Sequence, residues 1–454
     1  MALFIYLLLG FSIFYYEITR KKYFYIDPIT MFNFFYFLVY VIAPAALIVF
    51  GNHLILHDMP YGKYYFGKNI TTPYLVFFGY FAFIAGYESM MRYFSNSKAT
   101  FNIDIKQSEK RIVYTILIGN IILVFFIYIY ASEFGGLLKA IEQAQAYRSG
   151  AIPWHKYDFV LRFLSINTIL LYYTFYKVFL EIDTQYKNSY RIFFVISLLM
   201  MIVLTLLYDS RGYFIFQVSG LYALMVIYNK NYYLKYMIPT VIVALLFIMY
   251  GRILFQSMEY FIKDGFNAFI AAFSQRVEQQ AQEHTSIISY FTHAIVSLDA
   301  SLVHAGYDFN LRYFQDITDA FINIIPNQLL DIKQNNMLLM DVNSLILHGR
   351  AINIILPGIL GYFVYAFQVP GIFIGMFING IIGAILYRLF LRLYDFYKGS
   401  IVFFYILSLA YGYFAFRGVP DQILFENFGL IIVVFILLVN AKIEIFTKRQ
   451  LKYN

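Results

Sequence analysis

Four arginines stand where a hydrophobic stretch of this sequence ends, in the contexts Asp-Ser-Arg-Gly, Tyr-Gly-Arg-Ile, His-Gly-Arg-Ala and Phe-Arg-Gly-Val. They are Arg211, Arg252, Arg350 and Arg417, and Arg148 in Ala-Tyr-Arg-Ser-Gly is a fifth candidate. The planar fork of a guanidinium matches phosphate oxygens, and an adjacent glycine lets a ligand approach the backbone closely. The pattern therefore indicates a site for a phosphate-bearing ligand. The alternative is that each arginine only anchors a helix end or pairs with a neighbour such as Asp209 or Asp421.

A second group of candidates lies within residues 285–305. Small and polar residues recur there at steps of three or four, which predicts one face of a helix: Ser289, His293, Ser297, Ala300 and His304. Asp299 falls at the edge of the opposite, apolar face, where a carboxyl group can have a raised pKa and act as a general base. The alternative is a surface helix with a hydrated stripe. The two histidines are three turns apart, so we expect no metal site.

The segment 343–350 is a third candidate, because His348 comes two residues before Arg350. A histidine beside an arginine could combine a base with a phosphate clamp. Gly349 could equally close the C-terminus of a helix in the left-handed conformation that glycine favours. The sequence leaves both interpretations open.

The elements that surround these residues are membrane helices. Of the 454 residues, 61% are hydrophobic and only 13% are charged, against about a quarter charged in soluble domains. A membrane helix needs about 20 apolar residues, and eleven runs reach or approach this length: 2–16, 29–50, 72–91, 112–130, 159–180, 192–208, 212–228, 236–250, 371–390, 400–416 and 422–440. We therefore expect an all-α, polytopic integral membrane protein with about 11 transmembrane helices in a single domain, 1–454.

Lysine and arginine predict the orientation of the helices. Most of them lie in short segments that alternate along the chain: 17–28, 92–111, 181–191, 229–235, 391–399 and 441–454. The positive-inside rule places these segments in the cytoplasm. The N-terminus is then outside and the C-terminus is cytoplasmic, which requires an odd number of spans.

This topology leaves one large extracytoplasmic loop, residues 251–350, which carries four of the seven histidines. The apolar run 352–367 cannot be a span, because Arg388 and Arg392 would then lie outside. It contains Pro357, Gly358 and Gly361, and a broken backbone is tolerated at membrane depth only against protein or a water-filled cavity. We interpret 352–367 as a re-entrant or interfacial helix and expect function on the outer face.

Several kinds of chemistry lack their sequence signals. The chain has no cysteine, so disulfides and thiolate metal sites are excluded. We find no P-loop, no dinucleotide fingerprint and no Gly-x-Ser-x-Gly elbow, and no cytoplasmic domain that could bind a nucleotide sugar. We expect no cofactor and no nucleic-acid partner. A substrate would have to arrive already activated.

The pattern resembles Wzy-type polysaccharide polymerases, the oligosaccharide repeat unit polymerases of O-antigen and enterobacterial common antigen. The Asp209–Gly212 turn between two spans is similar to that group's Ser-Arg or Thr-Arg turn, and a large outer loop follows two spans later. Pro357–Gly361 and then Pro370-Gly371 are similar to its Pro/Gly segment, and Phe416-Arg417-Gly418 is similar to its last outer arginine turn. The paired arginine–glycine repeats described for some members are missing.

The resemblance implies a glycosyltransferase of the bacterial cytoplasmic (inner) membrane, acting in O-antigen, lipopolysaccharide or capsule synthesis. Its substrate would be a polyprenyl-diphosphate-linked oligosaccharide (undecaprenyl diphosphate in bacteria) among membrane lipids, with a flippase and a chain-length regulator as partners. The implied catalytic base is Asp299, His304 or His348. The implied diphosphate-binding residues are Arg211, Arg252 and Arg417, with Arg350 and Arg148 as further candidates. Tyr307 and Tyr313 would stack on sugars. The alternatives are a ligase that moves the finished glycan, and a non-enzymatic flippase or transporter.

Overall fold

The structure is a computed structural model. It describes all residues except 25, 56–58, 97–108, 149–151, 153–156, 182–184, 209, 230–231, 283–286, 323–337, 351–354, 397–400, 421–423, 425–426 and 430–454. The described residues are almost entirely helical and form no strand, as the apolar runs predict. The last predicted span, 422–440, falls largely outside the described residues.

The chain divides into two compact units. Unit 1 comprises Met1–Ala99, Thr285–Leu389 and Ser408–Phe425, and unit 2 comprises Thr100–His284, Phe390–Leu407 and Glu426–Asn454. The segment 251–350 is thereby divided, with its first third in unit 2 and the remainder in unit 1. The predicted site residues are divided in the same way. Arg148, Arg211 and Arg252 lie in unit 2, and the others, including both histidines, lie in unit 1.

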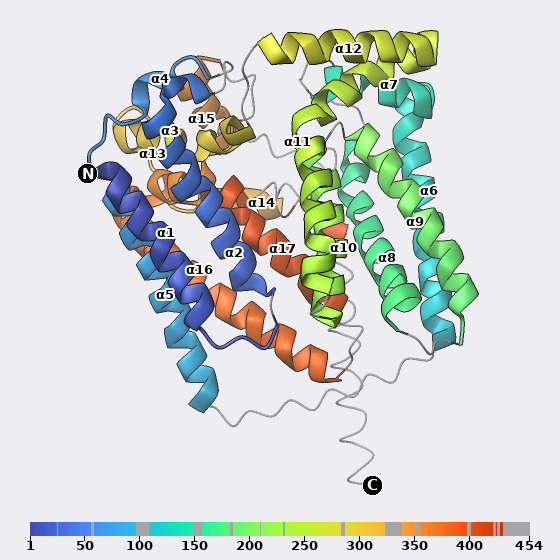
Figure 1. The fold of residues 1–454 in the computed structure, drawn as a ribbon, viewed down its shortest axis with the longest axis horizontal. Coiled ribbons are helices and arrows are strands. Elements are labelled where there is room, and N and C mark those ends of the chain that lie inside the picture. The colour runs from blue at the N-terminus through green and yellow to red at the C-terminus, as the bar shows by residue number, and fades with distance from the viewer. Residues whose placement is uncertain are drawn as a thin grey trace. The chain divides into compact units, whose positions relative to one another are not determined.

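Unit 1 is built from long helices and several short ones gathered at one end (Figure 1). The elements are α1 (Ala2–Thr19), α2 (Pro28–Phe37), α3 (Ala43–Phe50), α4 (Gly62–Tyr65), α5 (Thr72–Asn96), α13 (Thr292–His304), α14 (Gln315–Ile322), α15 (Leu339–His348) and parts of α16 (Gly358–Phe396) and α17 (Ile401–Arg417). A π-helical turn, Leu38–Ile42, joins α2 to α3. It precedes Pro44, which has no N–H to continue the α-helical pattern.

The chain entering α2 is fixed by a buried group of charges. The Asp27 carboxylate accepts the Thr30 N–H at 2.8 Å and caps the helix, with Pro28 in its first turn. The Arg20 guanidinium donates to Asp27 at 2.7 Å and to Glu17 at 3.0 Å. These contacts hold the end of α1 against the start of α2, so that α3 returns to the end of unit 1 where α1 begins.

Helix α13 is buried, although it carries several polar residues. All residues from Thr292 to Ser301 are buried, because α13 packs against α3, α4 and α15. The alternative of a surface helix with a hydrated stripe is therefore wrong. Its polar groups are bonded inside the unit: the Ser297 hydroxyl, for example, accepts from the Asn343 side-chain amide at 3.0 Å.

Helix α16 is broken near its start. Phe367 (φ −147°) and Gln368 (φ 55°, ψ −146°) leave the helical conformation, and the chain folds back, since a Cβ at Gly371 would lie 2.1 Å from the Phe363 carbonyl oxygen. Carbonyls freed at the break are used elsewhere: Tyr365 O accepts from Arg312 N–H at 3.0 Å, and Ala366 O accepts from Tyr313 N–H at 3.2 Å. The short first part, from Gly358 to the break, corresponds to most of the run 352–367. A re-entrant or interfacial position for this run stays a prediction.

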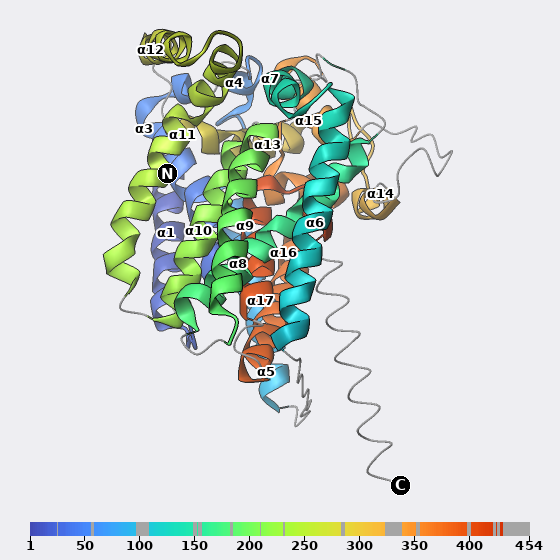
Figure 2. The ribbon, with the colours of Figure 1, turned by 90° about the vertical axis from the view of Figure 1, so that its right-hand side faces the viewer.

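Unit 2 contains α6 (Glu109–Glu133), α7 (Leu137–Arg148), α8 (Ile166–Phe175), α9 (Lys187–Leu207), α10 (Arg211–Tyr228), α11 (Tyr232–Asp264) and α12 (Phe266–Gln282). Figure 2 shows α6, α8, α9 and α10 side by side. Figure 1 shows α12 lying across the end of α11. Gly265, with φ +85°, makes this sharp turn between the two helices possible.

Within the described residues, seven helical segments are long and apolar enough to cross a membrane. They are Ala2–Thr19, Pro28–Phe50, Thr72–Ser95, Glu109–Glu133, Phe159–Leu180, Lys187–Leu207 and Gly358–Leu391. An eighth results if the bent pair Lys235–Gly251 and Ile253–Asp264 counts as one span. The prediction of an all-α membrane protein is thus confirmed at the level of fold class.

Candidate functional site

Helix α4 is a single turn that brings together the C-terminal ends of α13 and α15. The Tyr61 N–H, at its start, donates to Leu347 O of α15 at 3.0 Å. The Tyr65 ring, at its end, meets the His304 ring of α13 edge-on at 5.2 Å between centroids. Figure 1 shows the three helices at the same end of unit 1. We call this cluster the α4 site, and it comprises Tyr61, Tyr65, His304, Asp308, His348 and Arg350.

The first chemical group of the α4 site is a histidine–carboxylate pair. His304 Nδ1 is hydrogen-bonded to Asp308 Oδ2. Such a bond places the proton on Nδ1 and leaves Nε2 as the basic nitrogen. His304 Nε2 is shielded and has no hydrogen-bond partner among the described residues, whereas the whole side chain is 20% exposed. The pair has the composition of a general base, and the groups that cover Nε2 would have to move aside before a ligand hydroxyl could reach it.

A tight turn sets the geometry of this pair. Helix α13 ends at His304, and His304 O accepts the N–H groups of Tyr307 (3.2 Å), Asp308 (3.0 Å) and Phe309 (3.3 Å). Gly306, with φ +79°, allows the chain to reverse. The turn returns Asp308 to the side of His304, four residues earlier.

The second chemical group is the end of α15. Gly349 adopts φ +77° and donates its N–H to Leu345 O at 2.8 Å, which closes the helix. A Cβ at position 349 would lie 2.4 Å from the Tyr61 ring. Arg350 follows directly, is exposed, and has no ion-pair partner among the residues described. The helix-cap interpretation of this motif is therefore compatible with a phosphate-binding role for the arginine.

His348 lies at the last position of α15 and is partly buried. Its Nδ1 is shielded and has no hydrogen-bond partner in the described part of the chain. Among the residues that the structure describes, no carboxylate orients this ring as Asp308 orients His304. Of the two histidines, His304 is the better organised base.

Asp299 serves the framework of the site. Its carboxylate accepts the Thr72 hydroxyl at the start of α5 and the Gly67 N–H, at 2.8 Å, in the turn after α4. Its side chain is buried, and this burial raises the pKa of Asp299 to about 6, although the bonds from Thr72 and Gly67 lower it. Because both oxygens already accept hydrogen bonds, Asp299 is less accessible to a ligand hydroxyl than His304.

A buried polar network fixes the chain that enters α16. The Asn343 side-chain amide donates to Ile355 O at 2.9 Å, and its Oδ1 accepts from the Tyr365 hydroxyl at 3.2 Å. The Ser344 hydroxyl accepts the Ile355 N–H at 2.8 Å. The first half of the 343–350 motif is therefore structural, and only its end contributes to the α4 site.

Arg417 lies at the other end of α13. Its guanidinium stacks over the Tyr413 ring at 4.7 Å, and Phe416 beside it meets the His293 ring at 4.7 Å. Gly418 packs on the backbone of Gly358, where a Cβ would lie 2.0 Å from the carbonyl oxygen. At 1.5 Å per residue, His293 and His304 are about 16 Å apart along the helix, so the structure does not bring Arg417 to the α4 site.

The two predicted sugar-stacking residues are both exposed. Tyr307 is 78% exposed and lies in the turn after His304, whereas Tyr313 is 65% exposed. The Tyr313 ring meets Phe367 edge-on at 5.4 Å, at the break of α16. Tyr313 (φ 46°) and Phe314 (φ 61°) both adopt a left-handed backbone, which is uncommon for aromatic residues.

The other predicted arginines belong to unit 2. Arg211 is the first residue of α10, where Ser210 caps the helix by accepting the Tyr213 N–H at 3.2 Å. Arg252 lies where α11 bends by 64°, and Arg148 is the last residue of α7. Their backbones are described, but their side chains and the neighbours Asp209 and Asp421 lie outside the described residues. Convergence of all five arginines stays a prediction.

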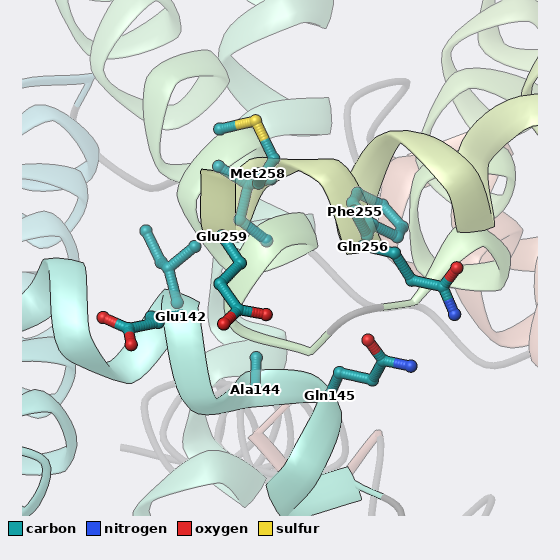
Figure 3. A pocket seen from close by; sticks show the side chains of 9 residues that line it. Glu142, Ala144, Gln145, Phe255, Gln256, Met258 and Glu259 are labelled. Carbon is teal, nitrogen blue, oxygen red and sulfur yellow. The ribbon is translucent and has the colours of Figure 1, made fainter. Parts of the chain in front are cut away.

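Unit 2 also contains a small polar groove between α7 and α11 (Figure 3). Figure 3 shows the side chains of Gln145 and Gln256 reaching toward each other across it. Lys263 Nζ binds Glu142 at 2.9 Å and Glu259 at 2.6 Å, so these carboxylates are charge-compensated. The groove can hydrogen-bond to hydroxyl groups, but none of the predicted site residues lines it.

Sequence reasoning missed four residues around the α4 site: Tyr61, Tyr65, Asp308 and Gln368. Of these, only Asp308 is close to a predicted site residue in the sequence, four positions after His304, but it lies beyond the end of α13, where helical spacing carries no signal. In the part of the chain that is described, no three His, Asp or Glu side chains are grouped so that they could hold a metal ion.

Comparisons with known proteins identify no relative. No protein-family model, no curated protein and no solved structure matches the chain.

Proposed function

We propose that the protein is a membrane glycosyltransferase that joins polyprenyl-diphosphate-linked oligosaccharide repeat units into a surface polysaccharide. The observation that carries the proposal is the α4 site, where an oriented His304–Asp308 pair lies at the same end of unit 1 as the exposed Arg350. Transfer of a glycan from a diphosphate to a hydroxyl needs these two functions, a base for the hydroxyl and a cation for the diphosphate.

In the proposed reaction, His304 Nε2 removes the proton of the acceptor hydroxyl. The hydroxyl oxygen forms a bond to the anomeric carbon of the donor glycan, and the bond from that carbon to the diphosphate oxygen breaks. Asp308 stabilises the resulting imidazolium. Base catalysis of this kind contributes about 10²–10⁴-fold to a rate. The proton leaves to solvent or to the departing diphosphate.

Arg350 is the arginine best placed to stabilise the departing diphosphate, through charge-assisted hydrogen bonds that its fork can make in pairs. Tyr307 and Tyr313 supply exposed rings for sugar stacking. The acceptor carries a diphosphate of its own at the far end of its oligosaccharide. Arg417, about 16 Å along α13 from His304, suits that second headgroup, and Arg211, Arg252 and Arg148 are further candidates for it. Arg211 lies at the start of α10, where the helix dipole would also favour a diphosphate.

The topology that accompanies this function has about eleven spans, with the N-terminus outside and the C-terminus in the cytoplasm of a bacterium. Segment 251–350 is then extracytoplasmic, and 352–367 is the re-entrant or interfacial helix. The path of unit 1 supports this orientation. Helix α1 ends at the basic residues Arg20–Lys22, α2 and α3 return, and α4 follows at the opposite end. A flippase would supply the substrate, and a chain-length regulator would act on the product.

The direct experiment is to reconstitute the purified protein with lipid-linked repeat units and to separate the products by size. A ladder of multiples of the repeat is expected, and substrate that binds but stays monomeric would rule the proposal out. His304→Gln is the matched variant, because it keeps a polar side chain of similar size and removes the base. A ligase would instead leave full-length, unattached chains when its gene is deleted, and a transporter would move the lipid without joining it.

A further inference from the structure

The break in α16 places a non-glycine residue where glycine is normally required. Gln368 has φ 55° and ψ −146°, a combination that is costly for any residue with a Cβ. The hydrogen bond of its side chain goes to a residue outside α16. A glycine at this position would form the same break without strain, so the amide group of Gln368 needs an explanation.

The Gln368 amide bonds to the turn that carries the histidine–carboxylate pair. Its Nε2 donates to Ala305 O at 2.9 Å. Gly306 lies directly under it, where a Cβ would approach Nε2 to 2.4 Å. Ala305 is the residue after His304, and the other backbone hydrogen bonds of residues 304–309 stay within the turn or come from α13. Among the described residues, Gln368 is the side chain that bonds this turn to another element.

We infer that Gln368 is a positioning residue of the α4 site: it holds the 304–309 turn so that His304 Nδ1 meets Asp308. The inference rests on the proposed role of His304. This positioning role explains why the backbone strain at Gln368 is retained. Glycine would relieve the strain, but it would also remove the hydrogen bond to Ala305 that holds the turn. Strained residues at functional sites are commonly held in this way by the surrounding structure.

The test compares Gln368→Ala with Gln368→Gly. Both variants lose the bond to Ala305, but only alanine keeps the backbone strain, so the glycine variant should melt at a higher temperature than the alanine variant. Both should lower kcat for polymerisation at least tenfold with KM within twofold of the wild-type value. A variant that is less thermostable but keeps the wild-type kcat would show that Gln368 is only structural.

A spectroscopic readout separates this inference from the proposed function. In protein labelled with ¹⁵N-histidine, the His304 signal, assigned with His304→Gln, reports the tautomer. We expect the Nδ1–H form in the wild type and a shift away from it in both Gln368 variants. The control Val369→Ala changes an exposed side chain directly after Gln368 and leaves the bond to Ala305 in place, so it should leave the His304 signal unchanged. An unchanged signal in the Gln368 variants overturns the inference, whether or not the wild type polymerises.

Discussion

Asp299→Asn should remove a pH-dependent contribution to stability. In the folded protein burial raises the pKa of Asp299 from 3.8 to about 6, so the folded state binds a proton more tightly than the unfolded state. Stability from this group is then fully present below the unfolded pKa and falls as the pH rises through about 6. The folded and unfolded pKa values differ by about two units, which corresponds to about 3 kcal/mol in the free energy of unfolding. Between pH 5 and pH 8 the loss is about 1.4 kcal/mol.

Asparagine reproduces the protonated carboxyl at this position. Its Oδ1 can accept the Gly67 N–H, and its Nδ2 can donate to the Thr72 hydroxyl, so both contacts of Asp299 have a counterpart. The variant should therefore be at least as stable as the wild type at pH 8 and should lack the decline between pH 5 and 8. For a unit of 150–250 residues the decline corresponds to roughly 3–5 °C in Tm.

The assay is thermal unfolding in detergent at several pH values, followed by intrinsic fluorescence or by loss of the monodisperse peak. Thiol-reactive dyes cannot be used, because the chain has no cysteine. Other groups also titrate, so the informative quantity is the difference between the two curves. Asp264→Asn is the matched control, since Asp264 is exposed at the end of α11. Parallel curves for the wild type and Asp299→Asn would refute the reasoning.

Three further predictions concern the α4 site. His304→Gln should lower polymerisation by about 10²–10⁴-fold while binding of lipid-linked substrate, measured by co-purification, persists; an equal loss of binding would argue against a base. Arg350→Lys keeps the charge but loses the paired hydrogen bonds, so kcat/KM should fall about tenfold, and a variant with normal kcat/KM would exclude recognition by the guanidinium fork. Gly349→Ala should lower Tm, since strain of about 1–3 kcal/mol adds to the clash with Tyr61; Leu345→Met, a change of similar volume at a partly exposed position of the same helix, is the control and should leave Tm nearly unchanged.

The fold class could be read from the sequence because membrane helices depend on local composition. Apolar runs that reach or approach the length of a membrane helix leave few alternatives, and the helices follow them closely. The environment of α13 could not be read in this way. Its helical period was visible, but its burial depends on α3 and α4, which lie far earlier in the chain, and on α15, which follows later.

Part of the candidate site could also be predicted from the local sequence. His304, His348 and Arg350 were recognisable by residue type, and the structure gathers them around α4. The partner of His304 was missed because Asp308 lies beyond the helix end, where helical periodicity no longer applies. Gln368 was missed because nothing in a sequence marks a glutamine that adopts a glycine conformation.

The break of α16 also constrains the order in which the protein can be assembled. The carbonyls of Tyr365 and Ala366 accept from the backbone of Arg312 and Tyr313, and in a membrane no water can replace these donors. The segment around Arg312 leaves the ribosome about fifty residues before the break. At the membrane depth predicted for 352–367, the Gly358–Ala366 helix can settle only when the segment around Arg312 lies beside it, so insertions on either side of the break should impair assembly.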